Sequence, residues 1–206
     1  MPGRADAVLL GGEVLPKVLW VRLYWDAGLG LSVAEGAATR HKMYAALLAP
    51  GGGELTVPGD SAMTYRDALC TSVDSWLSLF EDGSAEVGFT CFDPVAYGVR
   101  SEAESSSFTV GGTWATWPAV TLVARAGPVV KVADGATGKF VLVGRAFAGG
   151  EAVALDFARE TCTIEGVDAS GLVSLGSDFF SIGLGAVSLT FTGCSSHSVS
   201  RFEGWA

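Results

Sequence analysis

Short apolar runs separated by glycine turns dominate the second half of the sequence and restrict its fold more than any other feature. Turn pairs such as Gly127-Pro128 and Gly149-Gly150 separate the runs. Glycine supplies the positive φ angles that tight turns require, and proline supplies a fixed φ angle. Regular turn spacing of this kind predicts a β-sandwich or barrel. The expected strands are residues 108–110, 116–126, 129–132, 139–143, 152–157, 161–164, 172–175 and 187–191.

The first half of the sequence predicts more strands and one helix. The hydrophobic period changes from two to about 3.6 within residues 32–48. Ser32 and Glu35 have the spacing of a capping box, and Pro50 followed by three glycines ends the pattern. We therefore expect one helix there, which contains His41 as an ordinary helix residue. Further strands are expected at residues 54–57, 63–73, 75–80 and 85–92.

The run at residues 14–25 is apolar on both of its alternating faces. Strands with this pattern are covered on both sides, by their own chain or by another subunit. We take one face as a candidate oligomer interface, which consists of Val18, Trp20, Arg22 and Tyr24. Opposite them stand Leu19, Val21, Leu23 and Trp25.

The most polar stretch of the chain, GVRSEAESSS, predicts a linker between two domains. We expect a domain with one helix at residues 1–98, a linker at 99–107 and an all-β sandwich domain at 108–206. The predicted fold class is therefore mainly β, with α+β character in the first domain.

Composition and charge exclude several classes of function. The 206 residues carry 13 Lys and Arg against 22 Asp and Glu, a net charge of −9. Sequence-specific nucleic-acid binding and adhesion to anionic lipid both need clustered cations, which this chain lacks. No apolar stretch approaches the roughly 18 residues of a membrane helix, and no signal peptide is recognisable. We expect no membrane insertion and no secretion by signal peptide.

No catalytic, metal or cofactor site is expected. The two histidines, His41 and His197, have no supporting motif, and no phosphate-binding loop or HExxH pattern occurs. Two carboxylate pairs could in principle serve a hydrolase, and these are Glu102 with Glu104 and Asp156 with Glu160. In so acidic a chain we interpret them as solvated side chains.

Four cysteines and six tryptophans complete the inventory of distinctive residues. Cys70, Cys91, Cys162 and Cys194 contain no CxxC pair, so we expect buried free thiols, with one disulfide after release from the host as the alternative. Trp114 and Trp117 frame the start of a predicted strand, where they either fill a core or interface or, together with Trp205, contact a glycan.

Several short motifs resemble those of the distal tail proteins of siphophages. The stretch GFTCFDPVAY at residues 88–97 resembles the family's F-x-C-x-DP-x-x-Y segment, and GTWATWP at residues 112–118 looks like the entry to its C-terminal domain. The end of the chain, from SDFFSIGLG at residues 177–185 to RFEGW, is similar to the family's final hairpin. PGRAD at residues 2–6 is similar to an early PGR-D segment. Family members carry β-structure before that segment, so we expect this chain to lack the first strands.

The resemblance implies a structural protein of the virion tail tip, assembled in the host cytoplasm. Its first domain would form a ring, commonly a hexamer, and its second would be a galectin-like or carbohydrate-module-like sandwich. The implied partners are copies of itself, the tail tube protein, and tail-associated or receptor-binding proteins. No cofactor and no catalytic residue are implied.

A carbohydrate-binding module is the competing interpretation of the second domain. In that case host-surface glycans would be the ligand, and Trp114, Trp117 and Trp205 would contact them. A hydrolase is the third class, and nothing in the sequence favours it.

Overall fold

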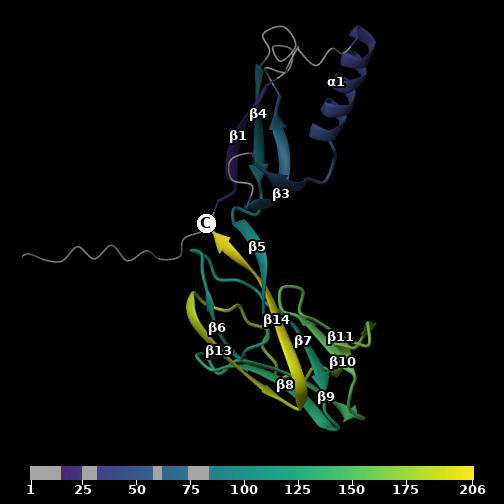
Figure 1. Cartoon of the computed structure of the whole chain (residues 1–206), viewed down its shortest axis with the longest axis vertical. Coiled ribbons are helices and arrows are strands. Elements are labelled where there is room, and N and C mark those ends of the chain that lie inside the picture. The colour runs from purple at the N-terminus through teal and green to yellow at the C-terminus, as the bar shows by residue number, and fades with distance from the viewer. Residues whose placement is uncertain (1–14, 25–31, 58–61, 74–83) are drawn as a thin grey trace, which may run out of the picture. The chain divides into compact units, whose positions relative to one another are not determined.

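A computed structural model describes residues 15–24, 32–57, 62–73 and 84–206 of the chain. The fold is mainly β, as the sequence predicts (Figure 1). It divides into two compact units, Met1–Pro94 and Val95–Ala206. The boundary expected at residue 98 is therefore four residues too late, because the first strand of the second unit begins at Ala96.

The first unit contains a four-stranded antiparallel sheet in the order β1-β4-β3-β2. Alternate residues of β4 point to a covered face, where Ala85, Val87 and Cys91 are buried together with Ala68 of β3. The strand expected at residues 75–80 lies outside the described part of the chain, as does the PGRAD segment. The strands are β1 (Lys17–Tyr24), β2 (Gly53–Thr56), β3 (Thr64–Ser72) and β4 (Ser84–Cys91).

Helix α1 (Val33–Leu47) begins and ends within a residue of its predicted bounds. Ser32 and Glu35 form the predicted capping box, because the Ser32 hydroxyl accepts the Glu35 amide hydrogen and the Glu35 carboxylate accepts the Ser32 amide hydrogen. None of the side chains described on α1 is buried. The local end signals therefore fix this helix, while packing contributes little to it.

The segment predicted to be a linker is mostly strand, and that prediction is wrong. Strand β5 (Ala96–Ala103) pairs antiparallel with β14 (Cys194–Trp205), with Ala103 opposite Val199. The polar side chains of β5 that suggested a linker are half-buried or exposed, as in a strand with one face in solvent. Only Glu104 to Ser106 separate β5 from the next strand.

The second unit is a sandwich of two antiparallel sheets. One sheet has the order β5-β14-β7-β10-β11-β12 and the other has the order β6-β13-β8-β9. The remaining strands are β6 (Ser107–Val110), β7 (Ala119–Ala124), β8 (Gly127–Asp134), β9 (Phe140–Phe147), β10 (Ala152–Asp156), β11 (Thr161–Ile164), β12 (Val167–Asp168) and β13 (Gly185–Thr192).

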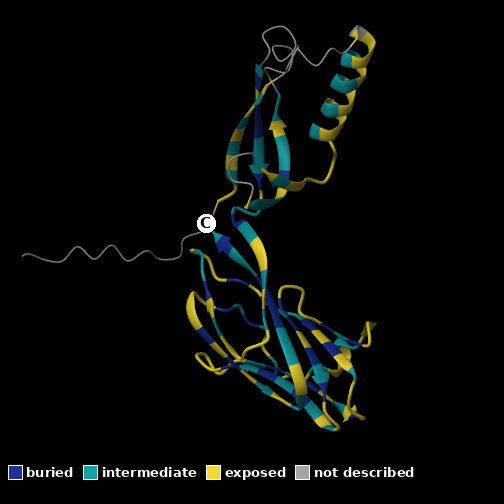
Figure 2. Ribbon diagram, viewed as in Figure 1, coloured by how far each residue is buried: buried dark blue, intermediate teal, exposed yellow. Residues whose placement is uncertain are grey.

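Period-two alternation builds the core of this unit. Buried residues alternate with more exposed ones along β7, β8, β9 and β10 (Figure 2). The inward side chains, mostly valine and leucine, meet between the two sheets. Phe157 is fully buried, and its ring makes edge-to-face contacts with Phe179 and Phe180 at 5.4 and 4.8 Å. These contacts make the three aromatic rings part of the core or pack them against it.

Two edge strands of the second unit are covered without a full neighbouring strand. The prediction of a strand at residues 172–175 is wrong, because a 3-10 turn, Ser170–Leu172, occupies its start. The chain then runs along β9, where the amides of Ser174 and Asp178 donate to the carbonyls of Leu142 and Phe140, both at 2.8 Å. This irregular segment satisfies the edge of β9 and blocks further strand addition there.

Side chains of β14 cover the edge of β6. The Arg201 guanidinium donates through Nη2 to the Thr109 carbonyl at 2.9 Å, and the Glu203 carboxylate accepts the Gly111 amide hydrogen at 3.1 Å. One donor and one acceptor thus take the place of a neighbouring strand. The exposed edge of a sheet is a template for association, and here β6 is protected from it.

Candidate functional site

All four predicted interface residues lie on one exposed face of β1. Burial alternates strictly along the strand, with Leu19, Val21 and Leu23 half-buried on the other face. Val18, Trp20 and Tyr24 are 53%, 63% and 75% exposed, and Arg22 stands between them. One face of β1 is therefore covered by the chain itself, while the other presents two aromatic rings and a valine to solvent.

The Trp20 ring lies over a glycine of the neighbouring strand. Gly88 of β4 lies opposite Trp20, and a Cβ atom added there would stand 3.2 Å from the indole atom Cζ3 and 3.3 Å from the Cβ of Ser72. Glycine therefore lets the indole lie across β4. Tryptophan and tyrosine rings are enriched among the residues that anchor interfaces.

Arg22 is joined to the next strand by an ion pair. Its guanidinium contacts the carboxylate of Glu86, which lies opposite it in the register of β1 and β4. Both side chains are more than half exposed, so the pair adds little stability. It does neutralise the one cation on this face, which leaves the exposed face of β1 apolar and without net charge.

β1 also lies at an edge of its sheet. Among the described residues it pairs only with β4, and β2 at the opposite edge pairs only with β3. The first unit therefore combines an exposed aromatic face with open edges, whereas β6 and β9 in the second unit are covered. Apolar faces and unpaired strand edges are the features that lead subunits to associate.

Two of the tryptophans expected to contact a glycan, Trp114 and Trp205, lie near the end of β14. Trp114 and Trp117 are 41% and 48% exposed, while Trp205 is half-buried. The amides of Thr113 and Trp114 both donate to the Gly204 carbonyl, at 2.8 and 3.0 Å. Trp114 thus lies on the segment that joins the end of β14, next to Trp205.

Trp205 packs on a glycine of β5. A Cβ atom on Gly98 would stand only 2.8 Å from the Trp205 ring, and the Ala206 amide donates to the Thr113 hydroxyl at 3.0 Å. These contacts tie down the end of the chain. Trp205 therefore has a packing role, and Trp114 and Trp117 are the more exposed of the three rings.

In each of the two carboxylate pairs considered for a hydrolase, one member has an ordinary structural partner. Glu102 lies 3.6 Å from Arg100, and Asp156 accepts the amide hydrogens of Ala158 and Arg159, both at 3.0 Å. Within the described residues no three metal-binding side chains gather at one point.

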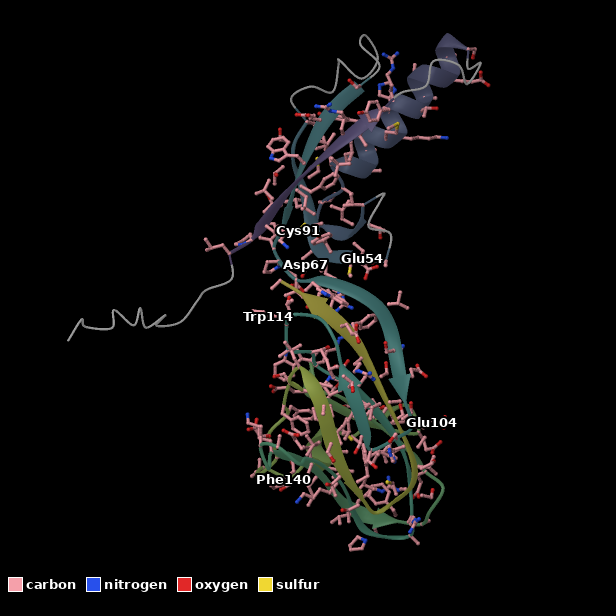
Figure 3. All side chains as sticks on the ribbon, turned by 60° about the vertical axis from the view of Figure 1, so that its left-hand side comes forward. Glu54, Asp67, Cys91, Glu104, Trp114 and Phe140 are labelled. Carbon is pink, nitrogen blue, oxygen red and sulfur yellow. The ribbon has the colours of Figure 1, made fainter. Side chains whose placement is uncertain are left out.

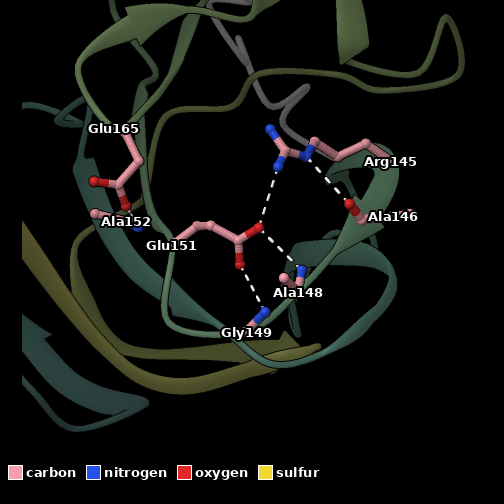
Figure 4. A network of polar contacts seen from close by, with 7 residues as sticks. All are labelled: Arg145, Ala146, Ala148, Gly149, Glu151, Ala152 and Glu165. Carbon is pink, nitrogen blue, oxygen red and sulfur yellow. Dashed lines mark hydrogen bonds and ion pairs between the residues drawn. The ribbon is translucent and has the colours of Figure 1, made fainter.

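The glycine pair Gly149-Gly150 forms the predicted turn, with φ angles of 99° and 95°. The carboxylate of Glu151 accepts the amide hydrogens of Ala148 and Gly149 at 3.0 and 2.7 Å and meets Arg145 at 3.1 Å (Figure 4). Hydrogen bonding to Ala148, and then to Gly149, lowers the pKa of Glu151, with Arg145 acting in the same direction. The donors of this turn are occupied by a carboxylate of the chain itself, so the turn is not a phosphate site.

The four cysteines are free thiols, of which Cys91 and Cys162 are buried and Cys70 and Cys194 half-buried. Burial, together with a smaller contribution from the Asp168 carboxylate, raises the pKa of the Cys162 thiol to about 11. A thiol that stays protonated near neutral pH is a poor nucleophile and metal ligand. The expectation of free thiols is confirmed, and that of burial holds for two of the four.

The described part of the chain contains no helix that is both long enough and apolar enough to span a bilayer. None of the curated proteins compared with the chain matches it.

Comparison with known proteins agrees with the motifs noted in the sequence. Residues 111–205 match the family described as siphovirus-type tail component, C-terminal domain. The chain is also similar in structure to the SPP1 Dit (gp 19.1) protein, whose crystal structure is described as a paradigm of the hub adsorption apparatus in phages that infect Gram-positive hosts. The TM-score is 0.70 at 19% sequence identity, over 98% of this chain and 86% of the other.

The family match covers most of the sandwich, and the structural likeness extends the shared fold over both units. Residues 111–205 therefore match the C-terminal domain of siphovirus-type tail components, and the two comparisons together support the interpretation of the chain as a siphophage distal tail protein.

Proposed function

We propose that this protein is a structural, non-enzymatic component of the tail tip that assembles with copies of itself into a ring. The ring, a hexamer, joins the tail tube protein to the tail-associated or receptor-binding proteins. It assembles in the host cytoplasm and remains at the tip of the virion tail. Its work is self-association and docking, for which no cofactor or catalytic residue is required.

The exposed face of β1 carries this proposal. Val18, Trp20 and Tyr24 are more than half exposed, on a strand at the edge of its sheet. Isolated chains rarely present aromatic side chains in this arrangement unless another molecule covers them. A closed ring needs two different patches on each subunit, and α1, none of whose described side chains is buried, supplies a second surface in the same unit.

The charge distribution supports the assignment of the first unit to the ring. Residues 1–94 carry 6 Lys and Arg against 12 Asp and Glu, so 6 − 12 gives −6 of the total −9. A channel through which DNA passes is best lined by negative charge, which repels phosphate and prevents adhesion. We propose that this acidic charge faces the channel of the ring. A ring whose negative potential lies on its outer rim would contradict that proposal.

Light scattering behind a sizing column tests the assembly. The full chain should give a mass near six subunits, or a mass that rises toward six with concentration. Replacing Trp20 and Tyr24 together by lysine should leave a folded monomer. The matched control is Val167→Lys with Leu175→Lys, which adds the same charge at two exposed apolar residues of the second unit.

A doubly substituted chain that still assembles, or that becomes insoluble because Trp20 belongs to the core, would refute the role of β1. A wild-type chain that stays monomeric at every concentration would refute the ring itself.

A further inference from the structure

An open groove of about 470 Å³ lies on the second unit, and neither the family match nor the tail-tip role assigns it a function. It is lined by Glu104, by residues 121–123 of β7 and by residues 195–198 of β14. Its volume lies within the roughly 300–1,000 Å³ of small-molecule sites in proteins. Figure 3 shows Glu104 beside this sheet, directly after β5.

Four of the eight residues that line the groove carry hydroxyl groups, and the other four are Glu104, Leu122, Val123 and His197. Ser198 lies opposite Thr121 and Ser196 opposite Val123 in the register of β14 and β7. The Ser195 hydroxyl donates to the Val123 carbonyl at 3.2 Å, but the hydroxyls of Thr121, Ser196 and Ser198 make no hydrogen bond to any described residue. Three hydroxyl groups on neighbouring strands are therefore available to a ligand.

Glu104 adds an unpaired carboxylate at the side of the groove. Residues 95–206 contain ten Asp and Glu side chains. Eight of them accept hydrogen bonds or form ion pairs, and only Glu104 and Glu160 have no partner among the described residues. Glu160 lies in a turn and does not line the groove. Glu104 is thus the one free acid placed beside free hydroxyls.

The composition of the lining excludes most ligand classes. No lysine or arginine lines the groove, so phosphate, acidic sugars and nucleic acid have no counter-charge there. β5 pairs with β14 only from Val199 onward, so an extended peptide that adds to the open edge of residues 195–198 is the competing ligand. The Glu104 carboxylate can accept hydrogen bonds from two neighbouring hydroxyl groups of a ligand, and the serine and threonine hydroxyls beside it can both donate and accept. Such a lining suits a neutral polyhydroxylated molecule.

We propose that this groove binds a neutral saccharide, with Glu104 as the principal acceptor and with Thr121, Ser196 and Ser198 as secondary partners. The site differs from the tryptophans named by the sequence. Trp114 is joined to Gly204 near the end of β14, whereas the groove lies at the start of that strand (Figure 3). The openness of the site and the lack of an aromatic platform predict weak, roughly millimolar binding by a single chain.

Saturation-transfer-difference NMR on the full chain tests the proposal, with cellotriose, N,N′,N″-triacetylchitotriose and galactotriose as neutral probes and a sialylated trisaccharide as the acidic probe. At least one neutral probe should give a saturable signal, and the acidic probe should give none. Glu104→Gln removes the negative charge that strengthens hydrogen bonds from sugar hydroxyls, and it should weaken binding about tenfold. Thr121→Val and Ser198→Val should each weaken binding severalfold.

Glu160→Gln is the matched control, because it removes the other unpaired acid of this unit outside the groove. It should bind as the wild type does. Thermal melts of every variant separate a lost site from a lost fold, and Ser196→Ala provides a milder groove variant if a valine substitution fails to fold.

Three outcomes would overturn the site: no saturable signal from any neutral probe, binding that Glu104→Gln leaves unchanged, or binding abolished by Trp114→Ala with Trp117→Ala but not by the groove variants. The groove variants should keep the solution mass of the wild type. Failure of the saccharide site is therefore distinguishable from failure of the ring.

Discussion

The guanidinium carbon of Arg201 lies 4.4 Å from the centre of the Phe108 ring. A residue of β14 thereby stacks on a residue of β6, which belongs to the opposite sheet of the sandwich. Arg201 is 7% exposed, and its Nη2 donates to the Thr109 carbonyl, but Nε and Nη1 have no hydrogen-bond partner among the described residues. Burial removes hydration from the guanidinium charge, and the cation–π contact and one hydrogen bond offset that loss only in part.

We expect Arg201→Met to change the free energy of unfolding by less than about 1 kcal/mol, because methionine keeps much of the packing and removes the buried charge. Arg201→Ala should destabilise the protein by about 2–4 kcal/mol, since it leaves a cavity beside Phe108. Urea unfolding followed by tryptophan fluorescence measures both values. Equal losses in the two variants would show that the polar contacts of Arg201, and not its volume, hold the two sheets together.

Gly112→Ala should destabilise the second unit by at least about 2 kcal/mol. Gly112 has a φ angle of 89°, and a Cβ atom there would stand 2.3 Å from the Gly204 carbonyl oxygen. The substitution therefore combines backbone strain with a clash at the end of β14. Gly127→Ala is the control, because Gly127 has no heavy atom within 4 Å of an added Cβ and no positive φ angle. Similar urea midpoints for the two variants would contradict this account of Gly112.

At acid pH the Asp134 carboxylate should lose its contribution to the free energy of unfolding. Burial alone would raise the pKa of this carboxyl, but hydrogen bonds from the Thr137 hydroxyl and from the amides of Ala136 and Thr137 outweigh it, and the pKa falls below its ordinary value of 3.8. A group with a lowered folded-state pKa stabilises the fold fully above its unfolded pKa and loses that effect as the pH falls through the folded value.

Urea unfolding between pH 5 and pH 2 measures the effect. Below about pH 4 the free energy of unfolding should fall less steeply for Asp134→Asn than for the wild type. The control Glu160→Gln, at a carboxylate without a partner among the described residues, should follow the wild type. An Asp134→Asn curve parallel to that of the wild type would mean that this turn is not linked to acid unfolding.

The sequence predicted those elements whose signals are local. Ser32, Glu35 and Pro50 mark the ends of α1 within a few residues, and the apolar runs around β11 and β13 are bounded by turns. β5 was missed because its order comes from pairing with β14, about 100 residues later in the chain, and not from its own composition. A strand held by such distant pairing leaves little local signal.

The candidate surfaces were predictable to different degrees. The alternation along β1 placed Val18, Trp20, Arg22 and Tyr24 on one face, although only the structure shows that this face is open. The groove beside Glu104 could not be found in the sequence. It depends on the register that brings Ser198 opposite Thr121, and that register is set by the hydrogen bonds between β14 and β7.

The stability of α1 should depend on its cap more than on packing. Its 15 residues are near the length at which an isolated helix is marginal, and none of its described side chains is buried. The Ser32 hydroxyl accepts the Glu35 amide hydrogen at 3.3 Å, and the loss of such a cap costs about 1 kcal/mol. Ser32→Ala should therefore speed amide hydrogen exchange in α1 about fivefold, while exchange in the sandwich stays unchanged. Ser32→Asn, which restores a capping oxygen, should return exchange in α1 to near the wild-type rate. Unchanged exchange in Ser32→Ala would mean instead that contacts with a neighbouring subunit stabilise the helix. In that case the Ser32→Ala substitution should speed exchange in α1 once the chain is made monomeric by Trp20→Lys and Tyr24→Lys.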